Sequence, residues 1–573
     1  MNPTPDQKSF PPAGGRRLLA CLLGLALAPL ALAQGVVSSG LTGLVRDPGG
    51  KPVANASVTA VHTPTGTTYS ATTTGGGRYN FRGLIVGGPY TVSVTASGYK
   101  GVERTDLATA LGQDVEVSFV LEAGAVVVME KFTVKDQKID LDAGAMGAAS
   151  LLDRDRLLLQ PTAQRSFADL ARTNAMVTLR NVFGDRQEGM LAAVGTNNRF
   201  NSVMLDGARI NDQFGLNASG LQSFFNPLSI ETVEQFSISV SPFDVRQSGF
   251  TGAAVNAVTR SGTNQFKGSL YGYYSDQKYA ARDLVGGAAG TRPFDERRTW
   301  GATLGGPILK NRLFFFANYE KFQRDQTAPT PGLTPDATDL TAINNAINAV
   351  KTASGKSFDQ GTFGGAGLIV TEEEKKLYKL DWNITKEHRL SVRYNETVGT
   401  LPQFGRYSSF GSFANPILSA AIPTTSAGTV LSSNFYAQIR TEEVYAGTLN
   451  SQWTPDFKTE FKYAKTSYEQ LTTNPVVLPE VRIMGVRGVN SAGATIANGF
   501  LAWGMEQFRH GNIIRVNTES YSGNADYFWR NFTFSGGFDR EESDFFNLFR
   551  ATSYGIFDRS EEHTSELQSL TNL

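Results

Sequence analysis

Side chains able to do acid–base, nucleophilic or metal chemistry are sparse in this chain and lie far apart. No H-E-x-x-H, G-x-S-x-G or P-loop motif is present. Two charged runs, 153–156 and 372–376, are interpreted as solvated surface rather than as paired carboxylates. The four histidines are His62, His388, His510 and His563. This pattern predicts a protein that is not an enzyme and that uses no metal or other cofactor.

The chemistry that the sequence does suggest is backbone pairing by a short extended segment. A Gly- and Ala-rich linker at 123–150 contains a β-prone island that ends in Glu130, Lys131, Phe132, Thr133 and Val134. Such a segment can add as a strand to the sheet edge of a partner, where backbone hydrogen bonds supply most of the affinity. The alternative is that it forms the last strand of the domain before it.

The N-terminus predicts an export signal. A pair of arginines precedes an apolar run that is shorter than the roughly 20 residues of a transmembrane helix, which disfavours a retained anchor. Cleavage after the small-residue site removes Cys21, the only cysteine, so the mature chain has neither disulfide nor thiol chemistry. The predicted signal consists of the charged pair Arg16 and Arg17, the apolar run at 18–32, and a cleavage site at Ala31 and Ala33 before Gln34.

Composition narrows the class of protein further. Basic and acidic residues both number 53, so no nucleic-acid footprint is expected. The 59 glycines and 11% aromatic residues favour strands joined by tight turns. No later run of 18 apolar residues occurs. The mature chain is therefore either soluble in the periplasm or enters a membrane as a barrel, since only helices and closed barrels satisfy their backbone in lipid.

Residues 38–122 predict a compact β-sandwich, because short alternating runs are separated by Gly- and Asp-rich turns. Five stretches of this region resemble the carboxypeptidase regulatory-like domain. The resemblance implies a prealbumin-like sandwich without catalytic residues, and a common setting at the N-terminus of certain TonB-dependent receptors. The matching stretches are 43–47, 50–53, 56–58, 77–81 and 96–99.

Residues 151–262 resemble the plug domain of those receptors. Three stretches follow the family order: a strand ending in Asp-Gly at 201–207, a helix-then-strand segment at 227–234, and a closing strand at 252–264. A short helix is expected at 166–170. In this setting residues 130–134 are similar to a TonB box. A polar loop with one aromatic, Asn197, Asn198, Arg199 and Phe200, is the candidate plug apex that contacts substrate.

From Phe266 onward, apolar and polar residues alternate in strand after strand. Leu270 and Tyr274 fall on one face, whereas Lys267 and Ser269 fall on the other. Short turns alternate with long connections such as 325–367. This is typical of strands with one face in lipid and one facing a wet or plug-filled lumen, with short periplasmic turns and long extracellular loops. The alternative is a soluble β-sandwich or propeller, whose sheets also alternate.

The barrel region, 263–558, is expected to be unfinished. At roughly ten membrane residues per strand it accommodates about 10 to 13 strands, whereas a plugged transporter barrel has about 22. Residues 305–320 resemble Oar-like receptors, a branch of the TonB-dependent class. Residues 559–573 break the alternation and resemble translated sequencing-adapter sequence. We expect the N-terminal part of a longer receptor that ends in an artefactual tail; a natural polar C-terminus is the alternative.

The predicted fold is mainly β: a prealbumin-like β-sandwich, an α+β plug domain and a partial transmembrane antiparallel β-barrel. The resemblance implies a receptor in the outer membrane of a Gram-negative bacterium, surrounded by outer-membrane lipid. It takes up an unidentified substrate with work supplied through a periplasmic TonB complex. An adhesion or scaffold protein anchored by the barrel is the alternative, and a soluble carbohydrate-binding β protein is the third. The sequence leaves the substrate and the oligomeric state open.

Overall fold

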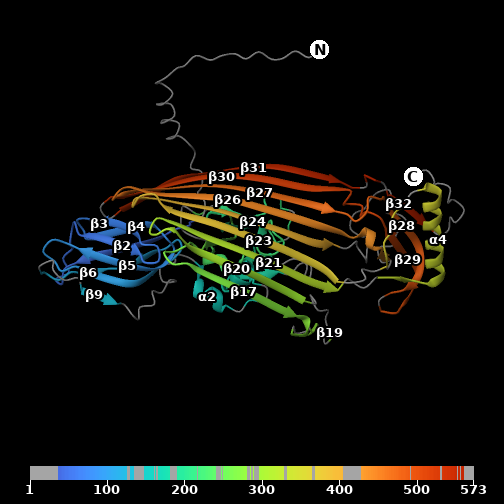
Figure 1. Ribbon diagram of the computed structural model, residues 1–573, viewed down its shortest axis with the longest axis horizontal. Helices are drawn as coiled ribbons and strands as arrows, with labels where there is room; N and C mark the ends of the chain where they lie inside the picture. Colours follow the sequence, from blue (N-terminus) through green and yellow to red (C-terminus); the bar gives the residue numbers. More distant parts are fainter. Residues whose placement is uncertain are drawn as a thin grey trace, which may run out of the picture.

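The computed structural model shows a mainly β protein with three parts along its long axis (Figure 1). A β-sandwich lies at one end, a sheet of long strands fills the middle, and a small unit with helix α4 lies at the other end. The predicted cleavage residues Ala31, Ala33 and Gln34, together with Val134, lie outside the described residues. The described residues are 36–124, 130–133, 148–160, 162, 165–180, 190–215, 217, 219–240, 247, 249–279, 284–285, 288–289, 296–327, 332–355, 357–363, 368–403, 428–490, 492–529, 532–551, 553–554 and 556–560.

The N-terminal sandwich packs two sheets around an apolar core, as its alternating runs predict. Inward-facing residues such as Val58, Phe81 and Val92 are fully buried. Gly77 has φ +72 and lies against the Val45 carbonyl, so the predicted glycine turn needs a residue without a side chain there. One sheet contains β1 (Ser39–Arg46), β4 (Arg78–Leu84), β7 (Asp114–Glu116) and β8 (Phe119–Val120). The other contains β2 (Ser57–His62), β3 (Thr67–Thr72), β5 (Gly87–Thr95), β6 (Val102–Thr109) and β9 (Glu130–Thr133).

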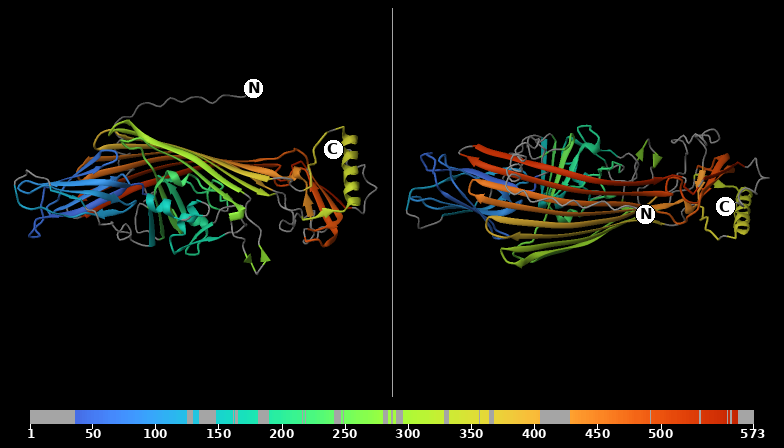
Figure 2. Two further views of the ribbon diagram at one scale, coloured as in Figure 1. Left: turned by 60° about the horizontal axis from the view of Figure 1, so that its bottom comes forward. Right: turned by 90° about the horizontal axis from the view of Figure 1, so that it is seen from above.

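The next part of the chain, here called the inner unit, lies against the concave side of the long-stranded sheet (Figure 2). The predicted short helix is present, and the Ser166 hydroxyl caps it by accepting from the Asp169 N–H at 3.1 Å. Its five-stranded sheet has the order β10 (Ala148–Asp153), β15 (Val233–Val240), β16 (Ala253–Thr259), β13 (Ser202–Leu205), β14 (Ala208–Arg209). Around it lie α2 (Arg154–Leu159), α3 (Phe167–Ala171), the hairpin β11 (Val177–Arg180) and β12 (Met190–Ala193), and the 3₁₀ turns η2 (Asn198–Phe200) and η3 (Ile230–Thr232).

Among the residues that the structure describes, an antiparallel sheet of nine strands forms the middle of the molecule. The sequence predicts about 10 to 13 strands for this region at roughly ten residues each. That number is too high, because the strands are 10 to 19 residues long and part of the region folds elsewhere. In order they are β17 (Lys267–Asp276), β20 (Glu296–Leu309), β21 (Leu313–Thr327), β23 (Leu368–Asn383), β24 (His388–Gln403), β26 (Tyr436–Thr454), β27 (Phe457–Thr473), β30 (Gly511–Trp529) and β31 (Phe532–Arg550).

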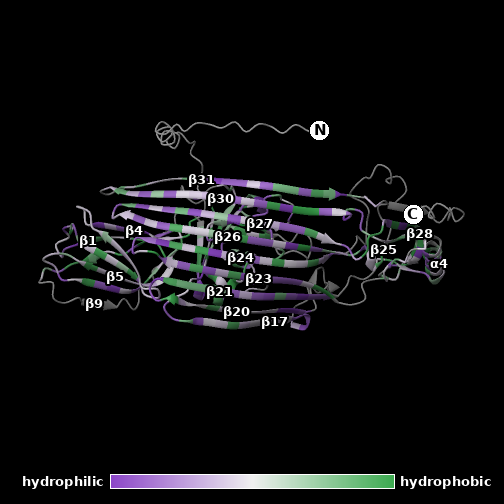
Figure 3. Ribbon diagram, turned by 45° about the horizontal axis from the view of Figure 1, so that its top comes forward, coloured by the Kyte–Doolittle hydropathy of each residue, from purple (hydrophilic) through white to green (hydrophobic). Residues whose placement is uncertain are grey.

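The two faces of this nine-stranded sheet have the character that the alternation predicts. Leu270 and Trp300 are 88% and 54% exposed on the convex face. Lys379 and Arg393 are 7% and 2% exposed on the concave face, under the inner unit. Hydrophilic and hydrophobic residues accordingly alternate along each strand (Figure 3). An apolar outer face and a polar inner face suit a sheet with lipid on one side only.

The connections at the end remote from the sandwich fold together into a distal unit that the sequence did not predict. Its core includes Leu333, Ile347 and Leu501. No helix among the described residues combines the length and the apolarity needed to cross a bilayer. The distal unit contains β22 (Thr334–Pro335), β25 (Gly428–Val430), β28 (Glu480–Val489), β29 (Thr495–Trp503), β32 (Ile556–Ser560), α4 (Ala337–Ser354) and η5 (Ser432–Asn434). The short elements η4 (Gln277–Tyr279), β18 (Leu284–Val285) and β19 (Ala288–Ala289) follow β17.

Strand β32 crosses the predicted start of the artefactual tail. It pairs in parallel with β28, and Arg559 and Ser560 lie opposite Ile483 and Met484. The strand therefore continues two residues past the boundary that the sequence predicts at residue 558. The remainder of that tail, 561–573, lies outside the described residues.

Candidate functional site

The inner unit is attached to the nine-stranded sheet most tightly at Asp206, which follows β13 directly. Thr259 donates its N–H at 2.8 Å and its hydroxyl at 2.6 Å to this carboxylate, and Arg393 Nε lies 3.1 Å away. Arg393 also donates to the Leu205 carbonyl at 3.0 Å. Burial by itself raises the pKa of Asp206, but Lys379 and Arg393 together bring it below its ordinary value. The ionised carboxylate therefore joins two strand ends of the inner unit to β24.

A second attachment uses a buried triad on the concave face. Lys375 Nζ lies 3.2 Å from both Glu320 and Glu373, and all three side chains are at most 8% exposed. The inner unit caps this triad from above: the Ser229 hydroxyl donates to Glu320, and the Phe225 N–H donates to Glu373 at 3.4 Å. Each carboxylate thus shares its charge between the Lys375 ammonium and a donor of the inner unit.

A third attachment centres on Glu231 in η3, at the base of β15. Its carboxylate lies 3.1 Å from Arg154 and 2.9 Å from Arg165 and accepts from the Tyr273 hydroxyl at 2.9 Å. Helix α2 begins at Arg154, so this carboxylate connects the start of that helix to β17 of the nine-stranded sheet. Ion pairs and charge-assisted hydrogen bonds, rather than apolar packing alone, hold the inner unit in place.

The four candidate apex residues do not converge on one cavity. The Asn197 side chain accepts from the Arg199 N–H at 3.0 Å and caps the 3₁₀ turn η2. Asn198 is buried close to Gly220, whereas Arg199 and Phe200 are exposed, Phe200 by 56%. Asn197 and Asn198 therefore shape the turn, while the side chains of Asn197, Arg199 and Phe200 lie exposed on the surface of the inner unit.

The backbone of the candidate box forms a strand of the sandwich. Glu130–Thr133 is β9, and it pairs in parallel with β6: Val102 lies opposite Glu130, and Thr105 opposite Thr133. This is the arrangement of the alternative interpretation, a last strand for the preceding domain. It leaves the segment extended, which is the conformation that strand addition to a partner also requires.

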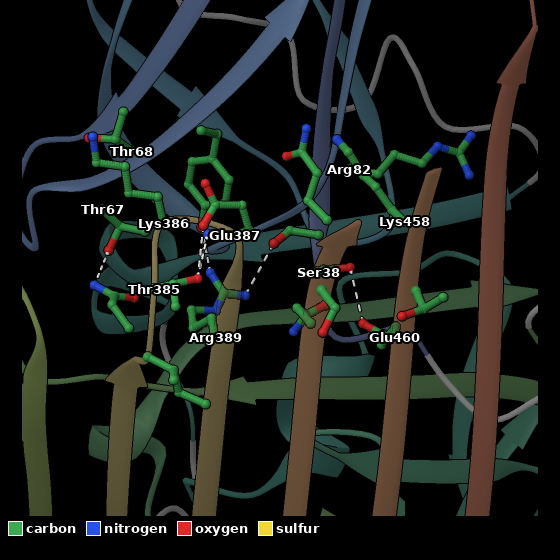
Figure 4. A pocket seen from close by; sticks show the side chains of 18 of the residues that line it. Ser38, Thr67, Thr68, Arg82, Thr385, Lys386, Glu387, Arg389, Lys458 and Glu460 are labelled. Carbon is green, nitrogen blue, oxygen red and sulfur yellow. Dashed lines mark hydrogen bonds between the residues drawn. The ribbon is translucent and has the colours of Figure 1, made fainter. Parts of the chain in front are cut away.

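A cavity of about 380 Å³, lined largely by residues with polar side chains, separates the sandwich loops from the short turns of the nine-stranded sheet (Figure 4). Residues from two of those turns, from nearby strand ends and from the sandwich line it, and hydrogen bonds cross between the two parts at its rim. A junction of this kind is readily hydrated. The contacts are Ser38 to Glu460 at 3.5 Å, Arg389 to the Gly83 carbonyl at 3.2 Å, Asn383 to Thr67 at 2.9 Å, and Gln452 to the Ser70 carbonyl at 3.0 Å.

The sandwich also contacts the inner unit directly. Gln235 of β15 accepts from the Leu111 N–H at 2.9 Å and donates to the Thr109 carbonyl at 2.9 Å. Asn256 of β16 donates to the Val36 carbonyl. The sandwich therefore covers the end of the inner-unit sheet that faces away from the distal unit.

Sequence reasoning noted Asp206 only as the end of a strand and Arg393 only as part of a polar face. The sequence contained a signal for both residues: Asp206 precedes a glycine at the end of a predicted strand, and Arg393 is a charge on the inward face of another predicted strand. Among the described residues, no three His, Cys, Asp or Glu side chains are grouped to hold a metal ion.

Comparisons with known proteins agree with this architecture. Residues 40–122 match the carboxypeptidase regulatory-like domain, and residues 258–366 match an outer membrane beta barrel domain. The TonB-dependent transporter Oar of Myxococcus xanthus is 27% identical over 403 residues, which cover 67% of this chain and 35% of that protein. The chain thus spans about a third of the length of this curated relative.

Two solved structures are similar to parts of this chain. The outer membrane transporter YddB of Escherichia coli has a TM-score of 0.48 at 12% identity, covering 72% of this chain and 50% of that one. The siderophore receptor PirA of Acinetobacter baumannii has a TM-score of 0.42 at 17% identity, covering 71% and 49%.

The sandwich matches a carboxypeptidase regulatory-like domain, part of the nine-stranded sheet matches an outer membrane beta barrel domain, and the chain is similar in part to a TonB-dependent transporter. The chain carries a carboxypeptidase regulatory-like domain before its outer membrane beta barrel region, and it is similar to the transporter Oar. Its location is the outer membrane of a Gram-negative bacterium.

Proposed function

We propose that this protein takes part in TonB-dependent uptake across the outer membrane, with the inner unit as the plug and residues 130–134 as the TonB box. The main support is the attachment of the inner unit inside the polar face of the nine-stranded sheet through Asp206 and Arg393. Ion pairs of this kind hold a plug, and water can replace them as the plug moves. The proposed activity is transport rather than catalysis.

The orientation in this proposal follows from the connections of the sheet. The turns beside the sandwich are short, such as 310–312, whereas the connections at the distal end are long. Short turns face the periplasm in outer-membrane barrels. The sandwich and the candidate box then lie on the periplasmic side, where a TonB partner operates. Export by a signal that is cleaved after Ala33 belongs to the same proposal.

The substrate is proposed to enter from the distal side and to meet the exposed Arg199 and Phe200 of the inner unit. A surface-adhesion role is the second candidate, because the distal unit has a packed core of its own, including Ile343 and Trp503. A folded unit on the cell surface can serve as a binding module without any transport.

Deletion of residues 130–134 separates the two candidates. We expect the deletion to abolish energy-coupled uptake, measured by mass spectrometry as the compounds that expressing cells remove from the medium. Adhesion of the same cells to a surface is expected to be unchanged. The matched control deletes 141–145, which shortens the linker equally and keeps the box. Uptake that survives loss of the box but not loss of the control segment contradicts the proposal.

A further inference from the structure

Strand β9 lies at the edge of its sheet, where a partner can reach the box. The sandwich sheet has the order β3, β2, β5, β6, β9, so β9 is its edge strand. All four residues of β9 lie in register with Val102–Thr105 of β6. Among the described residues, no strand pairs with the other side of β9.

A strand held on one side keeps half of its backbone groups for a second neighbour. Successive residues of a β-strand direct their N–H and C=O groups to opposite sides, so pairing with β6 leaves the outward groups of β9 open. An open edge of this kind is a template for another strand. The segment is also already extended, so a partner does not have to order a free linker before pairing with it.

We propose that the carboxypeptidase regulatory-like sandwich is a dock for the box: it holds Glu130–Thr133 as its edge strand and presents the outer edge to the periplasmic partner. That partner is a protein domain with an open sheet edge, which extends the five-stranded sheet by strand addition. This inference rests on the proposed function, because it assumes that residues 130–134 are the segment that TonB captures.

The dock is also the first contact to yield when the partner pulls. Strand β9 has four residues in register with β6, whereas β10, which follows it along the chain, has six residues in register with β15. The two pairings lie in series along the chain, so the shorter one separates first. The sandwich itself stays in place, because Gln235 and Arg389 tie it to the inner unit and to the nine-stranded sheet. The partner therefore captures the box before β9 separates from β6, and uptake requires both steps.

A reversible disulfide across the pairing tests the dock. Glu103 and Lys131 lie opposite each other in register, and Cys21 in the predicted signal is the only natural cysteine. We expect Glu103→Cys/Lys131→Cys to form a disulfide on oxidation. The probe is the purified periplasmic C-terminal domain of the host TonB. Its affinity is expected to stay within about twofold on oxidation, because the outer edge of β9 remains free.

Uptake is expected to depend on whether this disulfide is formed. In the oxidised pair it should fall at least about tenfold, because a covalently held box cannot leave β6, and it should recover on reduction. The matched control is Thr59→Cys/Lys131→Cys. Thr59 lies in the same row of the sheet as Glu103 but three strands from Lys131, through Ser93. This pair should neither cross-link nor lose uptake.

Three results overturn the dock. Failure of the Glu103→Cys/Lys131→Cys pair to cross-link shows that the box is not held on β6. Loss of TonB-domain binding on oxidation shows that the sandwich masks the box instead of presenting it. Full uptake by the oxidised protein shows that release is unnecessary. If the reduced protein fails to bind the TonB domain at all, the proposed function fails instead, so the two failures are distinguishable.

Discussion

The inner unit and the sandwich both contact the nine-stranded sheet, but through contacts that are buried to different degrees. The inner unit is attached through buried charges, such as Asp206 with Arg393 and Lys375 with Glu320. The sandwich is attached through less buried contacts around a cavity, which include the hydrogen bond of Asn383 with Thr67 and the ion pair of Arg82 with Asp526 at 3.4 Å. Buried charges are costly to separate until water reaches them, whereas partly exposed contacts at a hydrated junction exchange for water at a lower cost. A single contact of the inner unit therefore contributes more to stability than a single contact of the sandwich.

Removing the cation of the main attachment should produce the largest effect. Arg393→Met leaves the buried Asp206 carboxylate without its direct ion-pair partner, and we expect a loss of about 3–5 kcal/mol in the stability of the inner unit. Hydrogen exchange of β13 and β16 amides in detergent measures it. Addition of Asp206→Asn should recover part of the loss, because it removes the unpaired charge.

The matched control for Arg393 is an ion pair on the other face of the same sheet. Lys376 lies 2.6 Å from Glu396, with side chains 35% and 21% exposed. Lys376→Met should cost no more than about 1 kcal/mol, the value for exposed pairs. Equal losses in the two variants would remove the distinction between buried and exposed attachments.

Acid should loosen the sandwich through His62. This side chain is buried and accepts or donates one hydrogen bond with Thr65 at 2.8 Å. Burial, aided by the charge of Arg389, lowers the pKa of His62 to about 3 from 6.5. The neutral form is the folded one, so its stability is complete above pH 6.5 and is lost as the pH falls toward 3.

The stability that the sandwich loses through protonation of His62 amounts to about 1.4 kcal/mol per pH unit below 6.5, or about 2 kcal/mol at pH 5. Hydrogen exchange of β2 and β5 amides between pH 7 and pH 5, corrected for intrinsic exchange, measures it. His62→Gln should abolish the pH dependence in this range. If the stability of the His62→Gln variant falls with pH as steeply as that of the unchanged protein, another group causes the acid sensitivity.

A single neutral contact at the junction should have the smallest effect. Gln452→Ala removes one exposed hydrogen bond to the Ser70 carbonyl. We expect about 0.5 kcal/mol or less, because water replaces the lost donor. Protease sensitivity of the loop between β3 and β4 is a suitable measurement. A loss as large as that of Arg393→Met would show that the sandwich is fixed as firmly as the inner unit.

Local pattern determined much of this protein from its sequence. The alternation along strands such as β24, the short helix after Ser166 and the glycine turn at Gly77 each depend on residues a few positions apart, and the structure contains each of them. The number of long strands was predicted too high, because strand length depends on pairing with neighbours rather than on a residue's own preference. The distal unit was missed for a related reason: its strands come from separate connections of the sheet.

The sequence by itself determined which faces are polar, where turns fall and that residues 130–133 are extended. Tertiary structure decided the partners: Arg393 for Asp206, Gln235 for Leu111, and β6 for β9. The period of a strand and the cap of a helix depend on residues that are close together in the sequence. The partner of an edge strand or of an inward charge depends on which group folding brings next to it, and many residues on the same polar face are chemically equivalent until the chain is folded.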